Sequence, residues 1–143
     1  MRETIFTVRK NNKPLDISLY NWDEETGTFS TKENDLVIDF GNADNITFKI
    51  GFRTTIYCGS GCYINSGSFC KCYVGHGCYL NIGSGCYINS GDFCNINSLV
   101  GCNITSGRNS TINVIKLEEK VLVGSGSVII FRDEDNNLLD VKN

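Results

Sequence analysis

The sequence predicts an all-β protein, a parallel β-solenoid with about sixteen residues per coil and a β cap at each end. Three observations lead to this fold class: residues 51–114 repeat with a period of eight, seven of those eight octads begin with glycine, and apolar and polar residue types alternate inside each octad. A fixed period of this kind is typical of repeat architectures, in which each unit buries its apolar face against its neighbours.

The octads predict one short strand and one corner each. They read GFRTTIYC, GSGCYINS, GSFCKCYV, GHGCYLNI, GSGCYINS, GDFCNINS, LVGCNITS and GRNSTINV. Columns four, six and eight are small or apolar, and columns five and seven are polar or aromatic. Because successive side chains of a strand point to opposite faces, the first set predicts a buried face and the second an exposed one. The glycine of column one is interpreted as the bend.

Two octads per coil explain the composition of the buried columns. Two facing sheets of short strands enclose a thin interior, which suits Cys, Ser and Ile. Sixteen residues per coil also stack Tyr63 on Tyr79 and Tyr57 on Tyr73, and they align four asparagines in a ladder whose amides hydrogen-bond along the axis. The alternatives are a triangular prism with three octads per coil, and a trimeric β-prism built from three chains, as in some phage spike needles.

Residues 1–34 are predicted to form the N-terminal β cap, which covers exposed strand edges. Within it, 3–8 and 17–22 read as strands, the Asn-Asn pair of KNNKPL forms a turn, and Gly27 closes a polar turn at positive φ. The octad register is expected to continue through 35–50, which places the solenoid at 35–114. That register puts Ile38 and Ile46 in column four and Phe40 and Phe48 in column six.

Residues 115–143 are predicted to form a C-terminal cap and tail within the same structural domain. Residues 115–123 break the period, 124–131 look like one more octad with Ser127 and Ile129 in columns four and six, and 138–141 suit a last strand. The segment is acidic, which blunts edge-to-edge stacking. The acidic residues are Glu118, Glu119, Asp133, Glu134 and Asp135.

Composition narrows the function classes. A net charge of −3 and a pI near 5.1 argue against a nucleic-acid partner, because phosphate readers carry clustered Lys and Arg. The sequence contains no run of 18 apolar residues, so no membrane span is predicted. The N-terminal stretch lacks the apolar core of a secretion signal. The expectation is a cytoplasmic protein.

The eight cysteines invite three readings. Six of them occupy column four, the place of a small core residue, which favours buried free thiols. A thiolate metal cluster needs four convergent ligands, usually in C-x₂₋₄-C pairs, and the dominant spacing here is C-x₇-C. A disulfide scaffold suits secreted chains. We therefore expect a core ladder, with no metal and no other cofactor.

No catalytic residue is predicted. His76, the single histidine, lies at a corner without a companion, although an acyltransferase of the hexapeptide-repeat type would use a histidine as general base. Asp92 follows a glycine as in calcium-binding nonapeptide repeats, but those need an Asp in each row.

The candidate interaction face lies in columns five and seven. Tyr is enriched at protein interfaces, and amides offer both donors and acceptors. The alternative is that Tyr and Thr fill these columns because they suit strands. The candidate residues are Tyr57, Tyr63, Tyr73, Tyr79, Tyr87, Asn65, Asn81, Asn97 and Asn113.

From GSGCYINS to GDFCNINS the chain resembles a loose group of bacterial and phage proteins with G-x-x-C-x-[IF]-x-[TS] octapeptide arrays, and residues 20–40 resemble the leader of such arrays. The resemblance implies a phage or mobile-element setting in the cytoplasm of a bacterial host. The expected function is a non-enzymatic binding protein with a protein partner, an inhibitor of a host defence protein. The alternatives are a structural or virion-associated module, assembled as a homodimer or homotrimer, and an acyltransferase.

Overall fold

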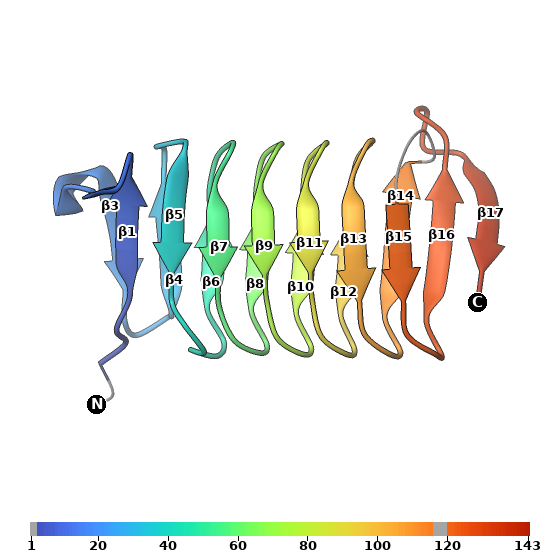
Figure 1. Cartoon of the computed structure of the whole chain (residues 1–143), viewed down its shortest axis with the longest axis horizontal. Helices are drawn as coiled ribbons and strands as arrows, with labels where there is room; N and C mark the ends of the chain where they lie inside the picture. Colours follow the sequence, from blue (N-terminus) through green and yellow to red (C-terminus); the bar gives the residue numbers. More distant parts are fainter. Residues whose placement is uncertain (1–2, 116–119) are drawn as a thin grey trace.

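The computed structural model describes residues 3–115 and 120–143 and is a β-solenoid of about six turns. Strands from alternate halves of each coil form two sheets, which stack along the long axis from β1 and β3 at one end to β17 at the other (Figure 1). Sheet A has the order β15-β13-β11-β9-β7-β5-β1-β2, and sheet B has the order β17-β16-β14-β12-β10-β8-β6-β4-β3.

The strand bounds follow the octads closely. Sheet A contains β1 (Thr7–Lys10), β2 (Lys13–Pro14), β5 (Leu36–Asp39), β7 (Thr55–Tyr57), β9 (Lys71–Tyr73), β11 (Tyr87–Asn89), β13 (Asn103–Ser106) and β15 (Lys120–Val123). Sheet B contains β3 (Tyr20–Asp23), β4 (Thr28–Thr31), β6 (Thr47–Lys49), β8 (Tyr63–Asn65), β10 (Tyr79–Asn81), β12 (Asn95–Asn97), β14 (Thr111–Ile115), β16 (Val128–Arg132) and β17 (Leu138–Lys142).

The coil length of the central solenoid is sixteen residues, as predicted. Tyr79 pairs in parallel with Tyr63 on one side and with Asn95 on the other, and the same offset joins β7 to β9, β9 to β11 and β11 to β13. This register contradicts the triangular prism of three octads per coil. Columns four and six fill the thin interior, where Cys70, Cys72 and Ile88 are fully buried.

The residue that makes the bend at each corner is not the predicted one. Positive φ recurs in column three, from Gly61 and Gly77 to Phe69, Phe93 and Asn109, and not in column one. The column-one glycines are needed because the column-two side chain of the preceding coil lies against them. A Cβ on Gly107, for example, would come within 2.8 Å of the backbone nitrogen of Asp92.

Column four requires a small donor as well as a small volume. The thiol of Cys70 donates to the carbonyl oxygen of Gly51 at 3.3 Å, and that of Cys102 donates to Gly83 at 3.3 Å. Ser127 occupies the same column and donates to Gly107 at 3.1 Å. From residue 51 onward the column therefore holds Thr, Cys or Ser, which supply a donor in a small volume, whereas Ile46 fills the same column one coil earlier without a donor.

The N-terminal cap closes one end of the rod with aromatic rings. β1 pairs antiparallel with β5 and β3 with β4. The rings of Phe6 and Phe40 stack with centroids 4.4 Å apart, and Trp22 lies 5.1 Å from Phe40. Asn11 and Asn12 both have positive φ between β1 and β2, as a two-residue hairpin turn requires, and Gly27 has φ +65° as predicted.

Three expectations for this region were wrong. Residues 3–8 do not form one strand, since β1 begins at Thr7 and continues to Lys10. Residues 17–22 do not form one strand: Ile17–Leu19 form a 3₁₀ helix, η1, because the Asp16 carboxylate accepts the Ser18 N–H at 2.9 Å. In addition, β4 lies inside the predicted cap but pairs in parallel with β6. The first parallel rung is therefore earlier than residue 35.

The register of 35–42 also differs from the prediction. Ile38 pairs with Ile56, which places Ile38 in column six and Phe40 in column eight. Phe48 pairs with Ile64 and is in column six as expected. The coil between them is eighteen residues long, since Val37 pairs with Thr55. Ile38, Phe40 and Phe48 remain buried, because a shift by two keeps the same face inward.

At the C-terminal end β15 and β16 continue the parallel stacking, but the offset of sixteen residues is broken there, as the sequence of 115–123 predicts. Asn103 pairs with Lys120 and Ile112 with Ile129, an offset of seventeen residues. Ser127 is buried in column four as predicted. β17 is antiparallel to β16 and is the last strand. The predicted acidic residues Glu118 and Glu119 lie outside the described residues.

Candidate interaction faces

The outer face of sheet B carries six of the nine candidate residues. Tyr63 and Tyr79 stack with ring centroids 5.0 Å apart and an interplanar angle of 4°. Beside them, the four asparagines occupy equivalent positions of consecutive strands, from β8 to β14. They are Asn65, Asn81, Asn97 and Asn113. Two aligned columns, one phenolic and one amide, therefore run along the axis on this face.

The outer face of sheet A carries the other three candidates. Tyr57 stacks on Tyr73 at 5.0 Å and 10°, and Tyr87 is tilted by 46° against Tyr73 with centroids 6.1 Å apart. Sheets A and B turn their outer faces away from each other, so the nine residues form two surfaces. A sixteen-residue coil predicts this division, with the Tyr63–Tyr79 stack on one face and the Tyr57–Tyr73 stack on the other.

The stacked rings offer edges and hydroxyls to a partner. Each ring in a stack covers the face of the next one, so a sugar or an aromatic ligand cannot lie flat on it. The hydroxyl of Tyr79 accepts a hydrogen bond from Nδ2 of Asn97 at 3.1 Å. This chemistry suits hydrogen bonding to polar groups of a partner.

The asparagine column does not form the predicted ladder of amide-to-amide hydrogen bonds. Among the described residues no side-chain hydrogen bond joins two of the four asparagines, and Nδ2 of Asn97 donates to Tyr79 instead. The Oδ1 atom of Asn113 is buried without a partner. The column therefore keeps hydrogen-bonding capacity that the fold itself does not use.

Two shallow grooves adjoin these faces. A groove of about 350 Å³ lies over the amide column of sheet B, and a groove of about 570 Å³ lies beside the Tyr57–Tyr73 stack of sheet A. The first includes Asn81, Asn97, Asn113, Leu99, Arg132 and Asn136 in its lining. The second includes Tyr57, Tyr73, Ser60, His76, Asp44 and Asn89.

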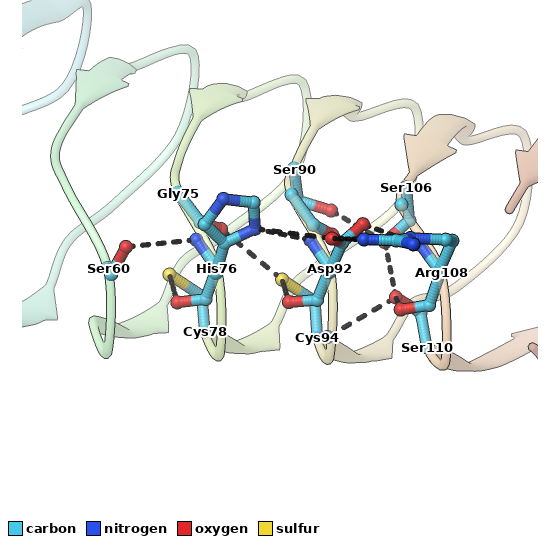
Figure 2. Close-up of polar contacts among 12 residues, drawn as sticks. Ser60, Gly75, His76, Cys78, Ser90, Asp92, Cys94, Ser106, Arg108 and Ser110 are labelled. Carbon is cyan, nitrogen blue, oxygen red and sulfur yellow. Dashed lines mark hydrogen bonds and ion pairs between the residues drawn. The ribbon is translucent and has the colours of Figure 1, made fainter.

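A ladder of polar side chains runs along the corner next to the second groove, and Figure 2 shows it from Ser60 to Arg108. Oγ of Ser60 accepts the backbone N–H of His76 at 3.1 Å, and Nδ1 of His76 accepts the N–H of Asp92 at 2.8 Å. Oδ1 of Asp92 accepts the N–H of Arg108 at 2.8 Å, and its other oxygen lies 3.1 Å from the Arg108 guanidinium.

The ladder determines the chemistry open to His76. Because Nδ1 accepts a hydrogen bond, the neutral ring carries its proton on Nε2 and presents a donor to solvent. A general base needs a free lone pair on an exposed nitrogen, which this tautomer lacks. The N–H of Arg108, followed by its guanidinium, lowers the pKa of the Asp92 carboxyl. Asp92 is thus a partner of Arg108 and of the corner backbone.

Six of the eight cysteines form two internal columns, with Cys58 and Cys72 beside them in octad columns eight and six; the two columns are Cys62, Cys78 and Cys94, and Cys70, Cys86 and Cys102. As predicted, each of the eight thiols is buried and free. The hydrogen bond with Cys58 raises the pKa of Cys62 to about 12, and burial raises the pKa of Cys72. In the other column, hydrogen bonds with Cys86 lower the pKa of Cys70 and of Cys102 and raise that of Cys86. Within 3–115 and 120–143, no group of three or more His, Cys, Asp and Glu is arranged to hold a metal ion.

The structure adds exposed aromatic residues that the sequence analysis did not single out. Phe69 and Phe93 occupy column three at positive φ, and each is 64% exposed. Phe52 occupies column two and lies over Gly67. The signal in the sequence is the presence of Phe in column three, where half of the octads have glycine.

Comparisons of the chain with protein-family models, with curated proteins and with solved structures found no match. In the described part of the chain, no helix has the length and apolar character needed to cross a membrane.

Proposed function

We propose that the protein is a non-enzymatic binding protein and that the outer face of sheet B contacts a protein partner. The observation that carries this proposal is the pair of aligned columns on that face: the Tyr63–Tyr79 stack and the amides of Asn65, Asn81, Asn97 and Asn113. Tyr presents a large, amphipathic contact area, and amides supply donors and acceptors at a regular spacing.

Rigidity supports the choice of this face. A side chain that is ordered only on binding costs about 1 kcal/mol of entropy, and the ring stack of Tyr63 and Tyr79 avoids much of that cost. The backbone below is held on both sides by parallel strands. The groove over Asn81 and Asn97 makes this face concave there, so that a partner side chain can fit into it.

The resemblance to octapeptide arrays of bacteria and phages suggests the biological setting. In that setting the partner is a host protein, and the solenoid acts as an inhibitor delivered by a phage or mobile element. The net charge of −3 favours a partner surface with exposed Lys or Arg. The protein then acts in the cytoplasm of the bacterial host.

The repeat supplies a matched pair of variants for the test. The octad GSGCYINS occurs twice, at 59–66 in sheet B and at 83–90 in sheet A. Tyr63→Ala/Asn65→Ala and Tyr87→Ala/Asn89→Ala therefore remove identical side chains from opposite faces. Tagged wild type and both variants are used to capture proteins from a host lysate, and the captured protein is identified by mass spectrometry and titrated against each variant.

The expected result is one specific host protein whose affinity falls at least about tenfold with the sheet B variant and stays unchanged with the sheet A variant. Equal binding by all three forms, or a loss confined to the sheet A variant, contradicts the proposal.

A structural, self-assembling module is the second candidate, favoured by the exposed apolar residues at the C-terminal end, such as Leu122 and Leu138. The acyltransferase alternative receives no support from His76, whose exposed nitrogen is a donor.

A further inference from the structure

The charged side chains along the outer face of sheet B are both cationic. From β6 to β16 the strands of this sheet contain two charged residues, Lys49 and Arg132. Lys49 pairs with Asn65 at one end of the asparagine column. Arg132 pairs with Ile115, beyond Asn113 at the other end. None of the carboxylates that make the chain net negative is on these strands, so the face itself is locally positive.

Arg132 lines the groove of about 350 Å³ that lies over Asn97 and Asn113. None of the ion pairs among the described residues includes its guanidinium. The carboxylate next to it in the sequence, Asp133, is already engaged, because it accepts the backbone N–H of Asn137 at 2.8 Å and Nδ2 of the same residue at 3.1 Å. The donors of the guanidinium are therefore available to a ligand in the groove.

The rest of the groove lining supplies further donors and an aliphatic wall. The side chains of Asn81, Asn113 and Asn136 form no hydrogen bond with another described residue, and each amide carries two N–H donors. Leu99 and Ile115 line the same groove, and Leu99 is 48% exposed. The groove thus combines a guanidinium and free amides with exposed aliphatic carbon.

This lining favours a carboxylate that is attached to aliphatic carbon. The planar fork of a guanidinium matches the two oxygens of a carboxylate, and such bidentate pairs are among the strongest hydrogen bonds in proteins. A nucleic-acid phosphate fits less well, because phosphate binding needs clustered cations. Lys49 and Arg132 are five strands apart along the sheet, about 24 Å at the usual strand spacing.

The groove and the whole chain act on a partner over different distances. The net charge of −3 attracts a basic surface before contact, and salt screens this attraction beyond about 8 Å. At contact, the groups that face Arg132 decide the fit. A basic partner surface with one carboxylate at the position of the groove satisfies both conditions.

We infer that the groove at Arg132 binds a carboxylate of the protein partner, with the guanidinium as its anchor and the neighbouring amides as further donors. This inference rests on the proposed function, because it names the group that the outer face of sheet B recognises. The carboxylate is that of a C-terminal residue or of an acidic side chain. Both present the same pair of oxygens, and the experiment separates them.

Small carboxylates test the groove without the partner. N-acetyl-leucine offers a terminal carboxylate, the α-amide of N-acetyl-glutamic acid offers a side-chain carboxylate, and N-acetyl-leucinamide offers none. NMR of the ¹⁵N-labelled protein follows Nε–H of Arg132 and the side-chain amides of Asn97 and Asn113. A saturable shift is expected with a carboxylate, at a dissociation constant of about 1 to 10 mM for ligands of this size, and none with the leucinamide. The carboxylate that binds more tightly identifies the source.

Two variants separate the groove from the general charge of the face. Arg132→Gln and Lys49→Gln each remove one positive charge from the same face, but only Arg132 lines this groove. The affinity for the carboxylate is expected to fall at least about tenfold in Arg132→Gln and less than about twofold in Lys49→Gln. Protection of the buried thiols from labelling checks that both variants are folded.

The outcomes that overturn the inference are specific. They are no shift with either carboxylate, an equal shift with the leucinamide, tighter binding of inorganic phosphate at the same signals, and an equal loss in both variants. A captured partner whose affinity depends on Tyr63 and Asn65 but not on Arg132 also overturns it, and the proposed function then stands. Carboxylate binding in the groove without any captured partner contradicts the proposed function alone.

Discussion

Oδ1 of Asp92 accepts the backbone N–H of Arg108 at 2.8 Å, sixteen residues further along the chain. The same relationship joins Asp44 to Ser60 at 2.8 Å, and Asn34 to Phe52 at 2.8 Å on the other corner. A side chain of one coil thus satisfies the corner backbone of the next, much as a capping residue satisfies the first turn of a helix. The corners are therefore cross-linked along the axis by side chains.

Removing one of these acceptors is expected to cost stability. Asp92→Ala leaves the Arg108 N–H without its acceptor and is expected to lower the free energy of unfolding. Asp92→Asn retains an acceptor oxygen and is the matched control. Urea unfolding measures both, and equal stability of wild type and Asp92→Ala contradicts the assignment.

Asp92 also predicts the sign of an acid response. Its pKa is held below the ordinary value of 3.8 in the folded state, so the unfolded chain binds a proton first as the pH falls. The stabilisation is therefore present above the unfolded pKa and is lost as the pH falls through the lower, folded value. Urea unfolding over a pH series should show a smaller acid-induced loss for Asp92→Asn than for the wild type.

The glycine columns are expected to differ in their tolerance of a methyl group. Gly107→Ala places a Cβ within 2.8 Å of the backbone at both Gly91 and Asp92, and we expect a loss of about 3 kcal/mol. Gly77→Ala meets nothing within 4 Å and retains only the strain of its φ of +65°, about 1 kcal/mol. Urea unfolding compares the two. A larger loss for Gly77→Ala contradicts the stacking argument.

The thiols are expected to be unreactive in the folded protein. All eight are buried, which keeps the reagent away from every thiol, including Cys70 and Cys102, whose pKa is lowered by hydrogen bonds with Cys86. The pKa of Cys62 and of Cys78 is raised to about 12 and about 11, chiefly by thiol–thiol hydrogen bonds, so little reactive thiolate forms at these two residues at neutral pH. Ellman's reagent should titrate eight thiols after denaturation and almost none before. Cys86→Tyr overfills the interior and should prevent folding, whereas Tyr87→Ala should not. Rapid labelling of the folded protein contradicts the core assignment.

One corner aromatic is expected to be replaceable with a gain in stability. Phe93 has φ +60° and is largely exposed, and asparagine occupies the same column at Asn109 with φ +55°. Asparagine tolerates this conformation far better than a bulky residue, so Phe93→Asn should raise the free energy of unfolding by about 1 kcal/mol. Phe69→Asn should gain less, because the Phe69 ring packs over Gly85. A loss with Phe93→Asn would indicate packing that offsets the strain.

The central solenoid could be predicted because period and alternation together define its register. With sixteen residues per coil, Tyr79 must lie next to Tyr63 on the neighbouring strand, and the asparagines must align. The shift at Ile38 could not be seen, because a change of two residues keeps every apolar side chain on the inner face. The glycine of column one was wrongly predicted to make the bend. Glycine is needed there because a side chain of the preceding coil lies against it, and this contact exists only when coils are stacked.

The candidate site was predicted less completely for a related reason. The sequence shows which residue types occupy columns five and seven. Successive octads alternate between the two sheets, so Tyr87 lies on sheet A and Tyr63 on sheet B. Ring stacking hides the faces of the tyrosines, and the bond from Asn97 to Tyr79 replaces the amide ladder. Such choices depend on side-chain conformations that a period does not contain.

The unequal ends bear on how the chain acquires its structure during synthesis. The aromatic cluster around Phe6 and Phe40 emerges from the ribosome first and can form a closed base before any octad is complete. Each later coil then has a finished template on one side, with the carboxylate of Asp44 already in place for the N–H of Ser60, and that of Asp92 for Arg108. The rod would thus grow in one direction, from the aromatic cluster towards β15 and β16.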